Sequence, residues 1–159
     1  MPEQWFLKVD GIAGESMADK YKGALDVLAW TWGVVGGVAG GSGGGAGTGK
    51  ATFQDLYVTT KISKASPLLL KACATGTHIK SVTLHGVKAG QQAQEFLTYT
   101  LSDVVLTSVQ QGDAESGAPV EHVSFGFRKA KVEYRPQKAD GSFGAAVTFT
   151  FDVAASKKL

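Results

Sequence analysis

Hydrophobic and polar residues alternate with a period of two along most of this chain. Such alternation is typical of strands that bury one face in a core and expose the other. The alternating runs are WFLKVD, LDVLAWTWG, TFQDLYVTTKI, KSVTLHGV, EFLTYTLSDVVLTSV, VSFGFRKAKVEY and AVTFTFDV. They predict a mainly β protein with roughly eight to ten strands, built as a sandwich or a barrel.

The alternation also assigns side chains to faces, because successive side chains of a strand point to opposite sides. The first run has a shared apolar face made of Trp5, Leu7 and Val9. The last run has the clearest pattern, with apolar positions at Val147, Phe149, Phe151 and Val153. The second run puts one set of residues on its apolar face, Leu28, Trp30 and Trp32, and leaves another set on the opposite face, Ala29, Thr31 and Gly33.

One segment departs from this pattern and predicts a short helix, KASPLLLKACATG. Ser66 stands where its hydroxyl can cap the free N–H groups, and Pro67 suits the first helical position. The apolar stripe of the helix is Leu69, Leu70 and Cys73. Gly76 is expected to end the helix, because glycine readily takes the left-handed conformation found there.

The bulk properties restrict the function without naming it. A chain of 159 residues fits one domain, spanning 1–159. A net charge of +2 is too small to indicate binding to nucleic acid or to an anionic membrane. Cys73 is the single cysteine, so no intramolecular disulfide can form and a reducing compartment is expected. The N-terminal MPEQWFLKVD has no apolar stretch of the secretory type, and no run predicts a membrane span, so we expect a cytoplasmic location.

A glycine-rich tract raises the question of nucleotide binding. Residues 44–50, GGAGTGK, fit the first seven positions of the phosphate-loop pattern G-x-x-x-x-G-K-[ST]. However, Ala51 lacks the hydroxyl that would hold Mg²⁺, the following residues predict a strand instead of a helix, and no buried strand precedes the tract. The formal G-x-S-x-G around Ser42 likewise lacks a strand before it and a helix after it. The tract is therefore interpreted as part of a flexible extended loop, about 33–50.

Two further sequence patterns are compared with known nucleic-acid and metal sites. VSFGFRKA resembles a ribonucleoprotein motif, but Val123 stands at its basic position and Ala130 at its last aromatic one. The candidate metal ligands are Cys73, His78, His85 and His122, and the distances between them along the sequence match no zinc-binding pattern. The carboxylates are scattered along the strands without pairing. Composition and spacing thus predict no catalytic site, no metal site and no cofactor.

Taken together and in order, several runs resemble the hemolysin-coregulated protein (Hcp) family, the tube proteins of bacterial type VI secretion systems. The resemblance covers roughly Trp5 to Asp152 and rests on FLKVDGIAGES, VLAWTWG, GGGAGTGKATFQDLYVTTKISKASPLLLKACATGTHIKSVTL, EFLTYTLSDVVLTSVQ and SFGFRKAKVEYRPQKADGSFGAA. The chain departs from the family in its glycine- and alanine-rich stretch between Trp32 and Lys50, and in having Thr31 where serine is common.

The resemblance implies a two-sheet β-barrel with one short α-helix on its flank, and a hexameric ring of such subunits. Rings would stack into a hollow tube inside a contractile sheath, and contraction would expel the tube and its spike. The implied partners are other copies of the chain, the spike protein, the sheath and baseplate, and small effector proteins held in the lumen. The implied location is cytoplasmic before firing and extracellular afterwards, without a signal peptide, and no enzyme activity is implied.

The resemblance also assigns roles to particular residues. With Trp30 and Trp32 facing the barrel, Thr31 is expected to line the lumen and contact cargo. The extended loop is expected to reach a neighbouring protomer or the next ring, and its contact residues would be Gly40, Gly41, Ser42, Gly43, Gly44, Gly45, Gly47 and Lys50. Two alternatives remain from the residues alone. One is a monomeric β-barrel that binds a small ligand or single-stranded nucleic acid, and the other is an enzyme.

Overall fold

The computed structural model describes residues 3–37, 51–88, 94–113, 115, 117–153 and 157–158. The long strands are β1 (Glu3–Val9), β2 (Leu25–Thr31), β5 (Leu56–Lys61), β6 (Ile79–Lys88), β7 (Gln94–Asp113) and β8 (Pro119–Tyr134). The remaining strands are β3 (Val34–Val35), β4 (Thr52–Phe53), β9 (Val147–Asp152) and β10 (Lys157–Lys158). The helical elements are the 3-10 turn η1 (Asp19–Tyr21) and the helix α1 (Ser66–Thr75).

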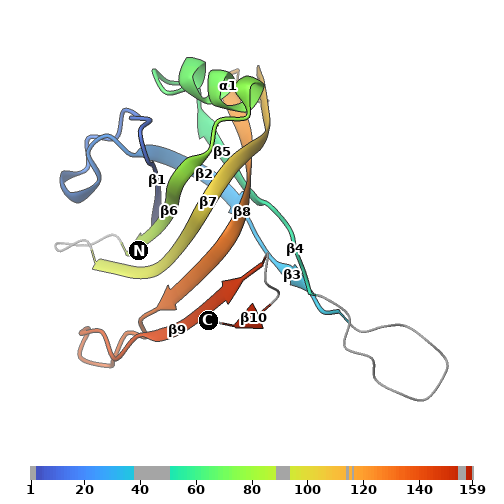
Figure 1. The fold of residues 1–159 in the computed structure, drawn as a ribbon. Helices are drawn as coiled ribbons and strands as arrows, with labels where there is room; N and C mark the ends of the chain where they lie inside the picture. Colours follow the sequence, from blue (N-terminus) through green and yellow to red (C-terminus); the bar gives the residue numbers. More distant parts are fainter. Residues whose placement is uncertain are drawn as a thin grey trace, which may run out of the picture.

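The long strands close into a barrel (Figure 1). The strand order in the main sheet is β10-β9-β8-β5-β2-β1-β6-β7, and an additional pairing of β8 with β7 closes the circle. Strands β9 and β10 extend the sheet beyond the closed part, and β3 pairs with β4 in a separate hairpin. Helix α1 lies across one end of the barrel. The predicted mainly β fold, a barrel with one short α-helix on its flank, is confirmed.

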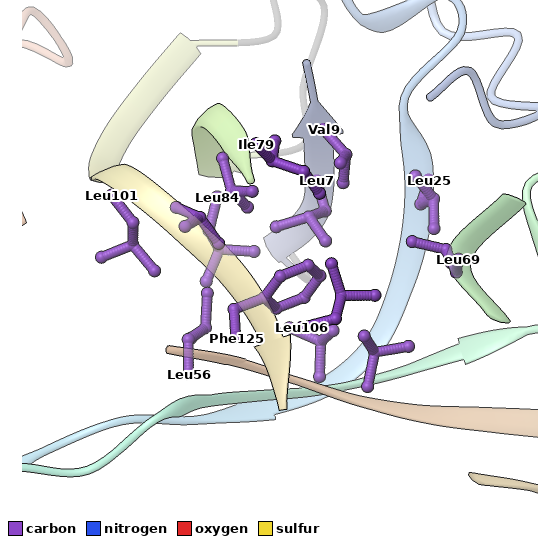
Figure 2. Close-up of a cluster of buried hydrophobic side chains, with 14 of the residues drawn as sticks. Leu7, Val9, Leu25, Leu56, Leu69, Ile79, Leu84, Leu101, Leu106 and Phe125 are labelled. Atoms are coloured by element: carbon purple, nitrogen blue, oxygen red, sulfur yellow. The ribbon is translucent and has the colours of Figure 1, made fainter. Parts of the chain in front are cut away.

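The barrel interior is filled mainly by aliphatic side chains from every closing strand and from the helix (Figure 2). Leu7 and Val9 of β1 lie inside, as the alternation predicts, and Trp5 packs against the same cluster. Phe125 of β8 is fully buried among them, and Leu69 brings α1 into the core. Burying a side chain of this size contributes about 1.5–3 kcal/mol to folding, so this interior is the main source of stability.

The predicted face assignment of β2 is wrong at one position. Leu25 and Val27 are buried, yet Leu28 is 51% exposed, while Trp30 and Trp32 pack against the core further along. The pairing of β2 with β5 shifts register between Val27 and Ala29, which marks a β-bulge. A bulge inserts one residue and reverses which parity of side chains points inward. A strictly alternating pattern cannot show this reversal.

Strand β7 changes its inward face in a similar way. Leu101 and Val104 are both buried. They are three positions apart, whereas residues on one face of a regular strand are an even number of positions apart. Asp103 between them has φ 53°, in the left-handed region that aspartate tolerates better than most residues. A register shift in the pairing of β7 with β8 follows between Leu106 and Ser108. These irregularities let one long strand turn a corner and serve both sides of the barrel.

The helix forms where predicted, but Ser66 does not cap it. The N-cap residue is Ala65, and Ser66 already belongs to the helix. The Ser66 hydroxyl instead donates to Glu121 Oε1 at 3.0 Å and accepts the Ser63 N–H. Glu121 is fully buried and also accepts a 2.7 Å hydrogen bond from Gln111 Nε2. This buried carboxylate therefore fastens the start of α1 to β8 and β7.

The other helix predictions are confirmed in part. Gly76 is the left-handed C-cap, with φ 64°. Leu69 is fully buried and Cys73 packs against the core, but Leu70 is 41% exposed. The buried face instead continues from Leu69 to Ala72. Residues three positions apart lie on the same side of a helix, and this is the side that faces the end of the barrel.

Outside the barrel, a second apolar cluster lies on the outer side of β1 and β6. Its buried members are Phe6, Tyr21, Ala24 and Val87. The chain between β1 and β2, residues 11–24, forms the cover of this cluster and includes η1. The Phe6 and Tyr21 rings stack with 4.6 Å between centroids and an interplanar angle of 2°. Phe6 thus uses the face of β1 that the barrel does not.

Candidate functional site

Thr31 lies on the outer face of the barrel, at the end of β2. It is exposed, and its neighbours point the other way, where Trp30 and Trp32 have ring centroids 5.0 and 5.5 Å from that of Tyr99. In the pairing of β2 with β5, Thr31 stands opposite Tyr57, which is 48% exposed. The side of the strand predicted for Thr31 is therefore the side it occupies.

The strands beside Thr31 carry mostly small hydroxyl side chains on the same outer face. Tyr57 of β5 is paired with Ser124 of β8, and Ser124 is paired with Ser108 of β7. Two residue pairs further along β5 and β8, Thr59 stands opposite His122. We call this surface the hydroxyl face, and its residues are Thr31, Tyr57, Thr59, Thr107, Ser108, His122 and Ser124.

Hydrogen bonds between neighbouring strands hold these hydroxyl groups. The Thr107 hydroxyl donates to Asp55 Oδ2 at 2.6 Å and lies 2.7 Å from Ser124 Oγ. Ser124 Oγ is in turn 2.6 Å from Ser108 Oγ. These contacts fix side chains that would otherwise rotate freely, so a partner meets a surface whose polar groups already have defined directions.

One contact on this face has a geometry that nucleophilic catalysis also uses. Thr59 Oγ1 lies 2.9 Å from Nδ1 of His122, which is a hydroxyl–imidazole pair. Acyl transfer also needs free N–H donors for the oxyanion. Both residues stand within paired strands, and β5 is paired on both sides here, so its backbone groups serve the sheet.

A second polar cluster lies under the covering residues 11–24. The Tyr21 hydroxyl donates to Glu95 Oε2 at 2.9 Å, and His85 Nδ1 lies 2.8 Å from Glu95 Oε1, which also accepts the Thr98 hydroxyl. Burial raises the pKa of Glu95, but the hydrogen bonds from His85 and Thr98, the charge of His85 and the bond from Tyr21 outweigh it and lower the pKa to about 2. Burial, and then the bond to Glu95, raises the pKa of Tyr21.

Sequence reasoning missed this carboxylate cluster, because Tyr21, His85 and Glu95 come from three separate segments of the chain. A cleft of about 380 Å³ lies beside it, lined on its charged side by Lys20, Glu95, Glu133 and Arg135. Its cations and carboxylates are mixed, and Arg135 Nη2 is 3.3 Å from Glu133 Oε1. We interpret the cluster as an anchor that holds the cover on the barrel. Glu95 is hydrogen-bonded to Tyr21 of the covering residues 11–24 and also to His85 and Thr98 of the barrel.

The predicted contact residues of the extended loop lie outside the described residues; they are Gly40, Gly41, Ser42, Gly43, Gly44, Gly45, Gly47 and Lys50. The described part of the predicted 33–50 loop begins with a strand, because Val34 and Val35 of β3 pair with Phe53 and Thr52 of β4. This hairpin projects away from the barrel (Figure 1). The glycine-rich sequence did not predict this short strand ladder between Val34–Val35 and Thr52–Phe53.

The residues weighed as metal ligands are spread over different elements. Cys73 is on α1, His85 on β6 and His122 on β8, with His78 just before β6. Within the described residues, no group of three or more His, Cys, Asp or Glu side chains could hold a metal ion. None of the helices among those same residues is long and apolar enough to cross a membrane.

A closed β-barrel whose interior is packed with side chains, and whose outer face presents fixed hydroxyls, places this protein in the all-β class. Comparison with known proteins gives the family. A family model described as "Type VI secretion system effector, Hcp" matches residues 6–134. The chain belongs to the Hcp family of type VI secretion proteins.

Individual relatives agree over nearly the whole length. The chain is 42% identical over 144 residues to "Protein hcp1" of Pseudomonas aeruginosa, covering 89% of each chain. Among solved structures, Hcp1 from Salmonella typhimurium is 34% identical with a TM-score of 0.83, covering 100% of both chains. A structure described as a type six secretion system protein is 28% identical with a TM-score of 0.92, covering 99% of this chain and 100% of the other.

Proposed function

We propose that this chain is the subunit of the inner tube of a type VI secretion system. Six copies close into a ring, rings stack into a hollow tube, and contraction of the surrounding sheath expels the tube with its spike. The proposal rests on membership of the Hcp family and on one structural observation, the hydroxyl face around Thr31. In this role the chain works with the sheath, the baseplate and the spike, and it has no catalytic function.

The hydroxyl face suits the wall of a lumen that carries effector proteins. Small side chains leave room for cargo, and hydroxyls both donate and accept hydrogen bonds, so they can meet varied protein surfaces. Tyr57, which stands opposite Thr31, adds an exposed ring that can bury apolar cargo atoms. In the cytoplasm the lumen would hold the effector, and after firing the subunit itself would be outside the cell.

The hairpin of β3 and β4 suits the second part of the proposal, the contact between rings. A two-stranded hairpin is marginally stable on its own in water. Val34 and Val35 are 52% and 69% exposed, so this hairpin has apolar side chains available for a neighbour. The glycine-rich residues 40–50, which follow β3 in the sequence, are the part of the chain that we expect to contact another protomer or the next ring, and assembly must offset the entropy of fixing so many glycines.

The lumen role is tested by Thr31→Arg and Thr31→Gln, with Thr77→Arg after the helix as a control for an exposed threonine elsewhere. We expect all variants to form rings by light scattering and negative-stain imaging, while the Thr31 variants lose about tenfold or more of the effector that co-purifies, as removal of a strong interface contact does. Unchanged effector retention in both Thr31 variants would remove Thr31 from the lumen wall.

The loop role is tested by deleting Gly40 to Gly47. We expect the deletion to weaken tube growth far more than folding, because the described barrel core is built from residues outside this stretch. Sedimentation of tubes and urea unfolding of the subunit measure the two effects. Equal loss of tube growth and stability would make the loop part of the core. A parent protein that stays monomeric would favour the alternative of a ligand-binding barrel.

A further inference from the structure

Strands β1, β6, β7 and β8 lie side by side in the sheet (Figure 1), and one row of polar residues crosses all four. Lys8 of β1 stands opposite Thr83 of β6, which stands opposite Thr100 of β7. Thr100 in turn stands opposite Lys131 of β8. The neighbours of this row along the strands, such as Leu84, are core residues, so the row faces away from the barrel interior.

The positions next to this row have the same composition. Ser81 of β6 stands opposite Ser102 of β7, which stands opposite Lys129 of β8. Strand β9 adds Thr150 opposite Lys131. None of these side chains is buried. We call this surface the lysine face, and its residues are Lys8, Ser81, Thr83, Thr100, Ser102, Lys129, Lys131 and Thr150.

Among the described residues, the hydroxyl groups of the lysine face have no hydrogen-bond partner, whereas those of the hydroxyl face bond one another. On the hydroxyl face, Ser124 Oγ lies 2.7 Å from Thr107 Oγ1 and 2.6 Å from Ser108 Oγ. On the lysine face, no such contact joins Thr83 to Thr100, although the two residues are paired. The hydroxyl groups of the lysine face are therefore free to donate to a partner.

The ammonium groups of the lysine face are likewise without a carboxylate partner in the described part of the chain. Lys8 Nζ donates to the Lys20 carbonyl oxygen at 3.4 Å and lies 5.4 Å from the centroid of the Tyr21 ring. No ion pair includes Lys129 or Lys131 within the same residues. The face is therefore positive and rich in donors, and the surface complementary to it is negative and rich in acceptors.

Two carboxylates that border the face already have cations of their own. Glu133 Oε1 lies 3.3 Å from Arg135 Nη2. Asp152, which stands opposite Lys129, is 5% exposed, and its Oδ1 lies 3.9 Å from Arg128 Nε. Each of these carboxylates is therefore paired with an arginine, and the row of lysines stays available to a partner.

A hollow of about 590 Å³ lies at the β1 end of the lysine face, and its lining includes Lys8, Lys22, Ser81 and Thr83. Lys22 belongs to the cover and brings a second ammonium group to this place. Asp10 is the carboxylate in the same lining. A negatively charged group that enters the hollow would thus meet two ammonium groups and two hydroxyl groups against one carboxylate.

We propose that the lysine face is a docking surface for an acidic segment of a partner protein. The carboxylates of that segment accept hydrogen bonds from the free hydroxyls and from the lysines, and such charge-assisted bonds are stronger than neutral ones. Lys8 and Lys131 are three strand spacings apart, roughly 14 Å, so an extended segment of about five residues reaches both. This inference goes beyond the proposed tube function and does not require it.

The composition of the face favours a protein over a nucleic acid or an anionic membrane. Binding of single-stranded nucleic acid uses exposed aromatic rings on which bases stack. The rings nearest to Lys8, those of Phe6 and Tyr21, stack on each other and are buried. Binding to a membrane surface needs apolar side chains that enter the lipid beside the basic ones, and the lysine face consists of lysine, serine and threonine.

The first test substitutes Lys131→Glu and, as a matched control, Lys71→Glu on α1, where the lysine is exposed and outside the face. Fluorescence anisotropy measures binding of a labelled decaglutamate peptide at low salt. We expect the parent and Lys71→Glu to bind with similar affinity and Lys131→Glu to bind at least about tenfold more weakly, because like charges would then face each other. Equal binding by both variants, or no binding by the parent, would overturn the proposal.

The same titration with a thymidine oligonucleotide, and pelleting with phosphatidylserine vesicles, tests the class of partner. We expect both to bind more weakly than the peptide. Tighter binding of either one, lost in Lys131→Glu and kept in Lys71→Glu, would overturn the assignment to a protein segment.

A cross-linking measurement on the unaltered protein covers the case in which Lys131→Glu fails to fold. A carbodiimide activates a carboxylate of the peptide, the lysine Nζ attacks it, and an amide bond forms as the carbodiimide leaves as its urea. Mass spectrometry should find the links at Lys8, Lys129 and Lys131 in preference to Lys71. Equal linking at Lys71 would overturn the proposal. Light scattering of the parent tests the tube function separately, since a monomer that still links at the lysine face contradicts the tube alone.

Discussion

Two stacked aromatic pairs lie outside the closed part of the barrel, and they differ in what covers them. Phe6 stacks on Tyr21 and is 5% exposed, while Phe149 stacks on Phe151 and is 40% exposed. The first pair is covered by the protein's own residues 11–24, whereas in the second pair Phe53 lies against Phe151 and Phe149 stays partly exposed. Either face of a strand can carry apolar side chains, but that face is buried only where another segment of the protein lies over it.

The cover over Phe6 is held by backbone and side-chain hydrogen bonds together. Gly14 N donates to Gly23 O at 2.7 Å, and Ser16 N donates to Ala24 O at 3.0 Å, so the two ends of the segment pair with each other. The Tyr21 hydroxyl then fastens the middle of the segment to Glu95 on β7. This segment is therefore a structured lid fixed to the barrel.

The largest expected effect compares the same substitution in both pairs. Phe6→Ala should lower the free energy of unfolding by about 3–5 kcal/mol, because it opens a cavity between the barrel and its cover. Phe149→Ala should lower the free energy of unfolding of the isolated subunit by under about 1 kcal/mol, since the phenyl ring of Phe149 is already partly exposed to water. Urea unfolding of both variants, with oligomeric state measured alongside, gives the difference. Similar costs in the isolated subunit would mean that Phe149 is covered within the chain.

A smaller effect is expected from changing the path of the cover. A Cβ on Gly14 would lie 2.5 Å from the Ala24 carbonyl oxygen, which is backbone and cannot turn away. Gly14→Ala should therefore lower the free energy of unfolding by about 1–3 kcal/mol through overpacking. Gly112→Ala is the control, because nothing lies within 4 Å of a Cβ there. Thermal unfolding that ranks the two variants equally would show that the cover can shift at little cost.

The smallest effect concerns the anchor of the cover and depends on pH. The pKa of Glu95 falls from 4.5 to about 2 in the folded protein. The unfolded state therefore binds more protons at Glu95 between these values, and the stability from the carboxylate is present above pH 4.5 and lost as the pH falls towards 2. Glu95→Gln should cost about 1 kcal/mol at pH 7, since the carboxylate is partly exposed to solvent.

Unfolding of the parent and Glu95→Gln from pH 7 to pH 2 checks this sign. The difference between the two proteins should shrink to near zero as the pH approaches 2, where the parent carboxyl is also protonated. A difference that stays constant with pH would mean that Glu95 acts through its shape and its hydrogen bonds alone. Growth of the difference on acidification would contradict the lowered pKa.

Much of the fold could be predicted because it depends on local chemistry. The alternation around Leu7 and Val9 follows from burying one face of a strand, and Gly76 ends the helix because of its own backbone freedom. The family resemblance came from runs of residues in order, and the side of the barrel taken by Thr31 came from its position between Trp30 and Trp32. Each of these needs only neighbours along the chain.

Other features depended on contacts between distant residues. The bulge at Leu28 and the left-handed Asp103 reverse the alternation so that long strands can turn around a closed barrel, and closure is a property of all the strands together. Ser66 has the composition of a helix cap, but it bonds Glu121, which is 55 positions away in the sequence. The Glu95 cluster is likewise assembled from three separate segments.

The sequence by itself determined which residues are apolar and on which side of a strand they alternate, because this periodicity is set by the backbone. It assigned Phe6 and Phe149 to strand faces on the same grounds. Only the tertiary structure decided that residues 11–24 lie over Phe6 and that Phe53 lies against Phe151 while Phe149 stays 40% exposed. Cover depends on where distant segments cross in space, and the pattern within a strand carries no information about that crossing.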